Sequence, residues 1–72
     1  MRRSEFLRAV DVEFGARGAA IVNDLVLSDI GRTSADALDE GVPPRDIWQA
    51  LCTDMDVPAA RRHRAGRLEP RR

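Results

Sequence analysis

The stretch Ala37-Leu-Asp-Glu-Gly-Val-Pro-Pro-Arg-Asp-Ile-Trp-Gln-Ala-Leu51 predicts a short helix, a glycine turn and a second helix. Thr33 is a good N-cap for the first helix, over 34–40, because its hydroxyl can accept a hydrogen bond from a free backbone N–H group. Gly41 suits the left-handed position that ends a helix, and a proline is tolerated in the first turn of the next one. This order of helix, turn and helix is typical of a helix-turn-helix.

The second of these helices has the clearest amphipathic pattern in the chain. Its apolar side chains recur at helical spacing and are Ile47, Trp48, Leu51, Cys52 and Met55. Trp48 and Cys52 are four residues apart and therefore share a face of the helix. That face has two interpretations, a pocket for a ligand or partner around the indole and ordinary core packing, and core packing is favoured.

Apolar residues at helical spacing predict two more helices in the N-terminal half. Ser4 is a good N-cap for a helix that ends at Phe14, and a second helix should run from Ala16 or Ala19 to Asp29. The predicted fold class is therefore all-α, with four short helices in one compact domain and the last two in a helix-turn-helix-like hairpin. The expected core consists of Phe6, Leu7, Val10, Phe14, Val22, Leu25, Val26, Ile30, Leu38, Ile47, Trp48 and Leu51.

The 72 residues are enough for one small domain, which we place over residues 1–58. Cys52 is the lone cysteine, so no disulfide can form within one chain, and such a cysteine is typical of a reducing compartment. No apolar run approaches the roughly 20 residues of a membrane span, and none follows Arg2 and Arg3 as a signal peptide would require. We therefore expect a cytoplasmic protein.

The net charge of zero hides a strong asymmetry between the two parts of the chain. Six Arg against eleven Asp or Glu give residues 1–58 a charge of −5, and six Arg against Glu69 give residues 59–72 a charge of +5. Leu68 is the one large aliphatic residue after Pro58, too little apolar surface to offset the entropy of ordering this segment. The sequence therefore predicts an Arg-rich C-terminal tail over 59–72 that is disordered or only transiently helical.

The usual catalytic and metal-binding patterns are missing from the sequence. One cysteine and His63 do not supply the three or four ligands of a zinc site. The lone histidine also lies in the predicted tail, away from any serine that it could activate, and the five glycines form no phosphate-binding loop. We expect no enzyme activity, no metal and no cofactor.

Nucleic-acid binding is the alternative that the basic residues raise. A DNA-binding hairpin places amide or basic side chains at the start of its second helix, where this chain has Arg45 and Gln49 beside Asp46 and two prolines. A hairpin used only for packing is the favoured interpretation. The tail is the other candidate, because arginines gain affinity for phosphates through counterion release. Its candidate residues are Arg61, Arg62, Arg64 and Arg67.

Residues 1–58 resemble a known family of short, mostly actinobacterial proteins, Domain of Unknown Function 3046. The resemblance implies a small helical protein without an assigned activity, cofactor or catalytic residue. The Arg-rich segment extends past the family's usual end, so the resemblance implies no function for it. The residues that carry the resemblance are Arg2, Glu5-Phe6, Phe14-Gly15, Asp24-x-Val26-Leu27, Gly31-Arg32-Thr33, Ala37, Gly41-Val42, Pro44-Arg45-Asp46-Ile47-Trp48-x-Ala50-Leu51-Cys52 and Asp56-Val57-Pro58.

Together these patterns favour a small non-enzymatic protein that acts through a protein partner of unspecified identity. Arg45, Trp48 and Gln49 are the candidate partner-binding residues, since they share the second helix of the hairpin. The alternative is an accessory nucleic-acid-binding protein that uses the hairpin and the Arg-rich tail.

Overall fold

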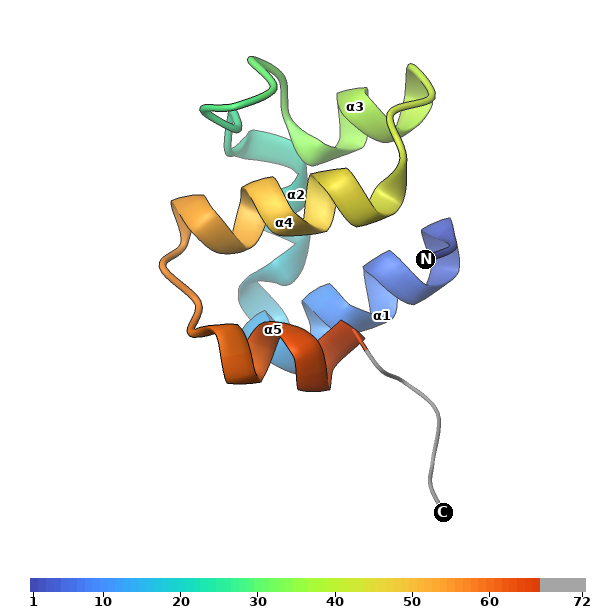
Figure 1. Cartoon of the computed structure of the whole chain (residues 1–72). Helices are drawn as coiled ribbons and strands as arrows, with labels where there is room; N and C mark the ends of the chain where they lie inside the picture. The colour runs from blue at the N-terminus through green and yellow to red at the C-terminus, as the bar shows by residue number, and fades with distance from the viewer. Residues whose placement is uncertain (67–72) are drawn as a thin grey trace.

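The computed structural model describes the backbone of residues 1–66 and the side chains of residues 1–62, and it confirms the predicted all-α fold. In Figure 1 the helix α4 (Pro44–Asp54) crosses the centre, with α3 (Ser34–Asp39) above it and α1 (Arg3–Phe14) and α5 (Ala59–Gly66) below it. The others are the 3-10 turn η1 (Gly15–Arg17) and α2 (Gly18–Asp24).

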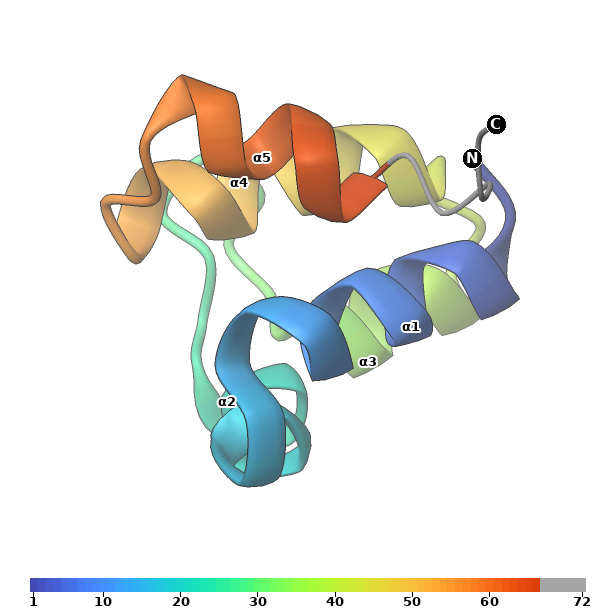
Figure 2. The same ribbon diagram turned by 90° about the horizontal axis from the view of Figure 1, so that it is seen from below.

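The core lies mainly between α1 and α4. Viewed from below, α1 lies between α5 and α2, so its side chains meet neighbours on two sides (Figure 2). The helix α4 contributes five of the buried residues, as its amphipathic pattern predicts. The buried apolar residues are Phe6, Ala9, Val10, Val22, Leu27, Ala37, Ile47, Trp48, Ala50, Leu51, Cys52 and Val57.

Two residues of the expected core are exposed. Leu7 is 45% exposed, because the inward face of α1 is centred on Phe6 and Val10 and leaves Leu7 at its edge. Val26 is 56% exposed, because the chain is extended there and neighbouring side chains point to opposite sides, so that Leu27 is buried instead. The prediction of these two core positions was wrong.

The second helix is shorter than predicted: α2 ends at Asp24 rather than Asp29. Leu25 is extended, with φ −79° and ψ 119°, and the chain then folds into a turn. The backbone N–H of Leu27 donates to the Arg32 carbonyl at 2.9 Å, and the N–H of Ser28 donates to Asp54 Oδ2 at 2.8 Å. Because these partners satisfy the backbone and the turn buries Leu27, tertiary contacts outweigh the helical propensity of this segment.

The first helix starts before Ser4, so the prediction that Ser4 is its N-cap is wrong. α1 begins at Arg3, and the Glu5 carboxylate accepts a hydrogen bond from the backbone N–H of Arg2 at 2.6 Å. A carboxylate in the first turn also interacts favourably with the positive end of the helix dipole. The Glu5 side chain therefore accepts a hydrogen bond from a free backbone N–H group at the start of α1, which is the role predicted for the Ser4 hydroxyl.

Both predicted ends of α3 are confirmed. Thr33 Oγ1 accepts a hydrogen bond from the backbone N–H of Asp36 at 3.2 Å, as an N-cap does. At the other end Gly41 has φ +92°, and its N–H donates to the Leu38 carbonyl at 3.2 Å. The N–H of Val42 donates to the Ala37 carbonyl at 3.0 Å, which completes a Schellman motif.

The end of α4 repeats this motif with an aspartate in place of the glycine. Asp56 has φ +59°, and its N–H donates to the Thr53 carbonyl at 3.2 Å. The N–H of Val57 donates to the Cys52 carbonyl at 2.9 Å, and the Val57 side chain is buried. Asp56 therefore holds a left-handed conformation that glycine adopts more easily.

The segment after Pro58 differs from the sequence prediction. Residues 59–66, within the segment that the sequence predicts to be disordered or only transiently helical, form α5, which packs against α1 (Figures 1 and 2). Residues 67–72, the remainder of the predicted tail, lie outside the described residues.

Replacing Asp56 by Gly should increase the free energy of unfolding by about 0.5–1 kcal/mol. The substitution relieves a left-handed non-glycine conformation and removes a negative charge from the negative end of the α4 dipole. Urea denaturation followed by circular dichroism measures the change. An unaltered or lower midpoint would show that Asp56 is not strained.

The matched substitution at the other Schellman motif, Gly41→Val, should have the opposite sign and cost about 1–2 kcal/mol. A Cβ atom added at Gly41 meets no atom within 4 Å, so the expected cost comes from the positive φ. The same urea titration tests it, and equal stability of the variant and the natural chain would contradict the assignment.

Candidate functional site

Trp48 lies at the junction of α1, α4 and α5 and is only 4% exposed. The rings of Phe6 and Phe14 meet it edge-on, with centroids at 6.3 and 6.5 Å. Its Nε1–H group donates to the Arg62 carbonyl of α5 at 3.3 Å. A buried indole needs such a partner for its polar end, and here the partner is the backbone of the last helix.

Two further contacts hold α5 in place. The Arg61 guanidinium forms an ion pair with the carboxylate of Glu13, whose side chain is only 8% exposed. Arg62 Nε donates to the Val57 carbonyl at 2.8 Å. Two arginines that the sequence analysis assigned to nucleic-acid binding therefore make contacts within the molecule.

Cys52 lies one turn after Trp48 and is fully buried. Burial raises the pKa of its thiol to about 11, and the nearby Arg62 charge offsets only part of that effect. The thiol is therefore neutral at physiological pH and packs as a small apolar group. The helix face that Trp48 and Cys52 share is therefore packed in the core and does not form a pocket around the indole.

The three residues proposed for partner binding do not share one surface. Arg45 and Gln49 lie on the exposed side of α4, whereas Trp48 is enclosed by α1 and α5. Of the tail residues, Arg61 and Arg62 are described with their side chains. The Arg64 side chain and all of Arg67 lie outside the described part, so their role stays a prediction.

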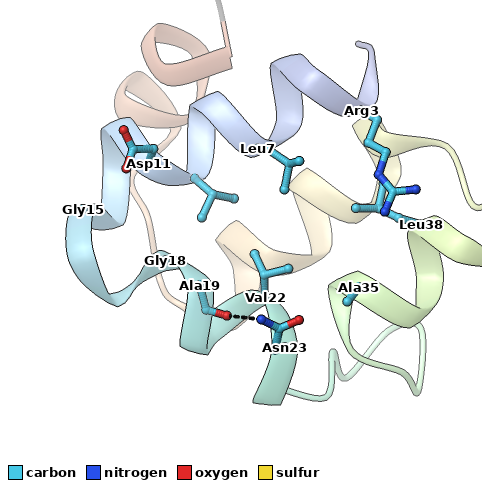
Figure 3. A pocket seen from close by; sticks show the side chains of 11 residues that line it. Arg3, Leu7, Asp11, Gly15, Gly18, Ala19, Val22, Asn23, Ala35 and Leu38 are labelled. Carbon is cyan, nitrogen blue, oxygen red and sulfur yellow. Dashed lines mark hydrogen bonds between the residues drawn. The ribbon is translucent and has the colours of Figure 1, made fainter.

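A groove of about 360 Å³ lies between α1, α2 and α3, on the side of α1 away from α5 (Figure 3). Gly18 lets α2 approach α1 closely, since a side chain there would come within 2.7 Å of Val10 Cγ1. Leu7 points into the groove from α1. The lining residues are Arg3, Leu7, Val10, Asp11, Gly15, Gly18, Ala19, Val22, Asn23, Ala35 and Leu38.

The charged residues of the groove lie at its two ends along α1, with Arg3 at one end and Asp11 toward the other (Figure 3). Arg3 makes a 3.4 Å ion pair with Asp39. The Asn23 amide donates to the Ala19 carbonyl at 2.9 Å, so its hydrogen-bonding capacity is partly used within α2. Helical periodicity does not reveal this groove, because it predicts that Leu7 belongs to the core.

Metal-binding clusters and membrane-spanning helices are both absent from the described part of the chain. Among residues 1–62, whose side chains are described, no group of three His, Cys, Asp or Glu residues is placed to hold a metal ion. Over residues 1–66, no helix has the length and apolar character needed to cross a bilayer.

Removing residues 59–72 should expose the Trp48 indole, because α5 accepts its N–H group, and should open the core around the nearby Cys52 thiol. We expect a red shift of the fluorescence emission, faster reaction of the thiol with Ellman's reagent, and a loss of about 1–3 kcal/mol in the free energy of unfolding. A chain ending at Gly66 is the matched control and should retain the native emission. Native emission and stability in the shorter chain would show that α5 is not part of the packed structure.

The comparisons with known proteins place the chain in one family. A 28-residue segment, 39% of this chain, is 57% identical to the "Putative envelope-preserving system protein" of Mycobacterium tuberculosis strain ATCC 25618 / H37Rv. The match spans only 10% of that protein's length. No solved structure matches the chain significantly. The family described as "Protein of unknown function (DUF3046)" matches residues 1–60, from the N-terminus through α4 to the start of α5, and the chain belongs to this family.

Proposed function

We propose that this protein has no enzymatic activity and acts by binding another polypeptide through the groove between α1, α2 and α3. The observation that carries the proposal is Leu7, a large apolar side chain that is 45% exposed and lines this groove. Val10, Val22, Ala35 and Leu38 extend the apolar surface around it.

The energetics of burial support binding at this groove. An apolar side chain placed against such a surface contributes about 25 cal/mol for each Å² removed from water. Interfaces gain most of their affinity from a few anchors in concave sites, and polar residues surround such anchors. The groove has this arrangement, with aliphatic side chains inside and Arg3, Asp11 and Asn23 among its lining residues.

The composition of the groove also supports a binding role over catalysis. Its lining contains one carboxylate, from Asp11, and one guanidinium, from Arg3, and these lie toward opposite ends (Figure 3). General acid–base catalysis needs titratable groups within hydrogen-bond reach of the same reacting atom. The groove residues do not meet that condition, whereas apolar binding needs only shape and exposed aliphatic surface.

The proposal shifts the binding surface from α4 to α1. Arg45, Trp48 and Gln49 are the partner-binding candidates from the sequence, but α4 directs its apolar side chains into the core. Its exposed side presents polar groups, which suit the rim of an interface more than its centre. Arg45 and Gln49 remain candidates for the nucleic-acid alternative.

Internal ion pairs weigh against a role centred on nucleic acid. Arg3 pairs with Asp39, Arg32 with Glu40 at 2.8 Å, and Arg61 with Glu13. A carboxylate beside each guanidinium competes with phosphate for it. Phosphate binding would have to break these pairs or rely on the other arginines.

Immobilised protein should capture a polypeptide from an extract of cells that express it, with or without nuclease treatment. The substitution Leu7→Gln should abolish capture, since it places a polar group in the apolar groove. Val12→Gln is the matched control, because Val12 is 63% exposed on the same helix but does not line the groove. Capture by Val12→Gln should equal that of the natural chain.

The nucleic-acid alternative predicts a different pattern in the same assay and in titrations with labelled duplex. Binding would then disappear with nuclease, with Arg45→Ala and Gln49→Ala, or on deletion of residues 60–72. It would also decrease steeply with salt, by about 0.9 log unit per phosphate contact for each log unit of salt. That pattern, with Leu7→Gln unaffected, would overturn the proposed function.

A further inference from the structure

We infer that the polypeptide bound at this groove is a second copy of the same chain, with the two α1 helices antiparallel across a two-fold axis at Leu7. The inference rests on the proposed function and names its partner. It comes from the order of charges along the exposed edge of α1, together with the exposure of Leu7 at the centre of that edge.

Arg3, Leu7 and Asp11 are spaced four residues apart and all line the groove. Figure 3 shows Leu7 between the two charged residues, with Arg3 at one end of the groove and Asp11 toward the other. At 1.5 Å per residue, each charge lies about 6 Å along the helix from Leu7. The edge therefore has a positive end, an apolar centre and a negative end.

This pattern is complementary to its own antiparallel copy. When a second α1 is turned end for end about Leu7, its Asp11 lies opposite Arg3 of the first copy, and its Arg3 lies opposite Asp11. A two-fold interface requires this property, because each contact between unlike residues must occur twice. A parallel arrangement would instead place like charges together, which is unfavourable.

The apolar part of the groove can accept the second copy at the same axis. Leu7 of the second copy would contact Leu7 of the first and cover the aliphatic surface formed by Val22, Ala35 and Leu38. On the α2 side of the groove, Ala19 has a short side chain, which allows a second helix to approach closely. Each copy would then bury an aliphatic side chain that is half exposed in the single chain.

The existing ion pair between Arg3 and Asp39 does not prevent this contact. Both side chains of that pair are more than half exposed, and its atoms are 3.4 Å apart. Exposed pairs of this kind contribute little to stability, so the Arg3 guanidinium can turn toward a second carboxylate. Because the interface has one anchor from each copy, we expect weak association at the low end of specific interfaces.

Sedimentation analysis of the full chain over micromolar to millimolar concentrations should show association from one chain of 8.0 kDa toward twice that mass. Arg3→Asp and Asp11→Arg should each weaken association about tenfold, because both attractive pairs become repulsive. The double variant Arg3→Asp/Asp11→Arg should restore it, since reversing both charges returns the complementary order. An equimolar mixture of the two single variants should form a mixed dimer.

The controls separate the interface from general effects of charge. Arg8→Asp changes the net charge as Arg3→Asp does, but Arg8 does not line the groove, so this variant should associate like the natural chain. Circular dichroism of each variant should show unchanged helix content. Restored association in the double variant and in the mixture also shows that each altered chain folds.

A chain that sediments as a single copy at every concentration would overturn the inference. A dimer that both single substitutions leave intact would do so too, since its interface would lie elsewhere. A single-copy chain that still captures a different polypeptide through Leu7 would overturn self-association and leave the proposed function standing. Single-copy behaviour with no Leu7-dependent capture would overturn both.

Discussion

The indole of Trp48 meets Phe6 and Phe14 edge-on, and its N–H group donates to the Arg62 carbonyl, so one side chain joins α1, α4 and α5. A chain of 72 residues buries a limited fraction of its surface, and large aromatic side chains then supply much of the core. Cys52, one turn after Trp48, and Val57 are buried in the same core. The groove is formed on the opposite side of α1, because that helix is held against α4.

Charge has a different role here from the one that composition indicates. The acidic body and the basic end of the chain meet where Arg61 pairs with the largely buried Glu13. Arg62 adds a hydrogen bond to the Val57 carbonyl. A segment with few apolar side chains is thus ordered by ionic and backbone contacts on an aromatic surface, because removing Glu13 from water without a partner would be costly.

The ends of the helices determine where the chain turns. The ends of α3 and α4 carry the same hydrogen-bond pattern, with Gly41 at one and Asp56 at the other in the left-handed conformation. Val42 and Val57 follow them, and Val57 returns the chain to the core before α5 begins. These turns bring α4 and α5 against α1, and the edge of α1 with Arg3, Leu7 and Asp11 stays exposed.

The sequence alone determined the features that depend on neighbouring residues. These are the all-α class, the Thr33 cap, the Gly41 turn and the buried face of α4, because helical periodicity and capping are local properties. The tertiary structure decided the rest. Helical spacing places Leu7 and Val26 in the core, yet burial depends on which neighbours cover them, and the described residues leave both exposed. The early end of α2 required Asp54, which is distant in sequence, to accept the Ser28 N–H. The order of α5 required Glu13 and Trp48 as partners, and no local pattern around Arg61 and Arg62 encodes contacts with residues so far along the chain.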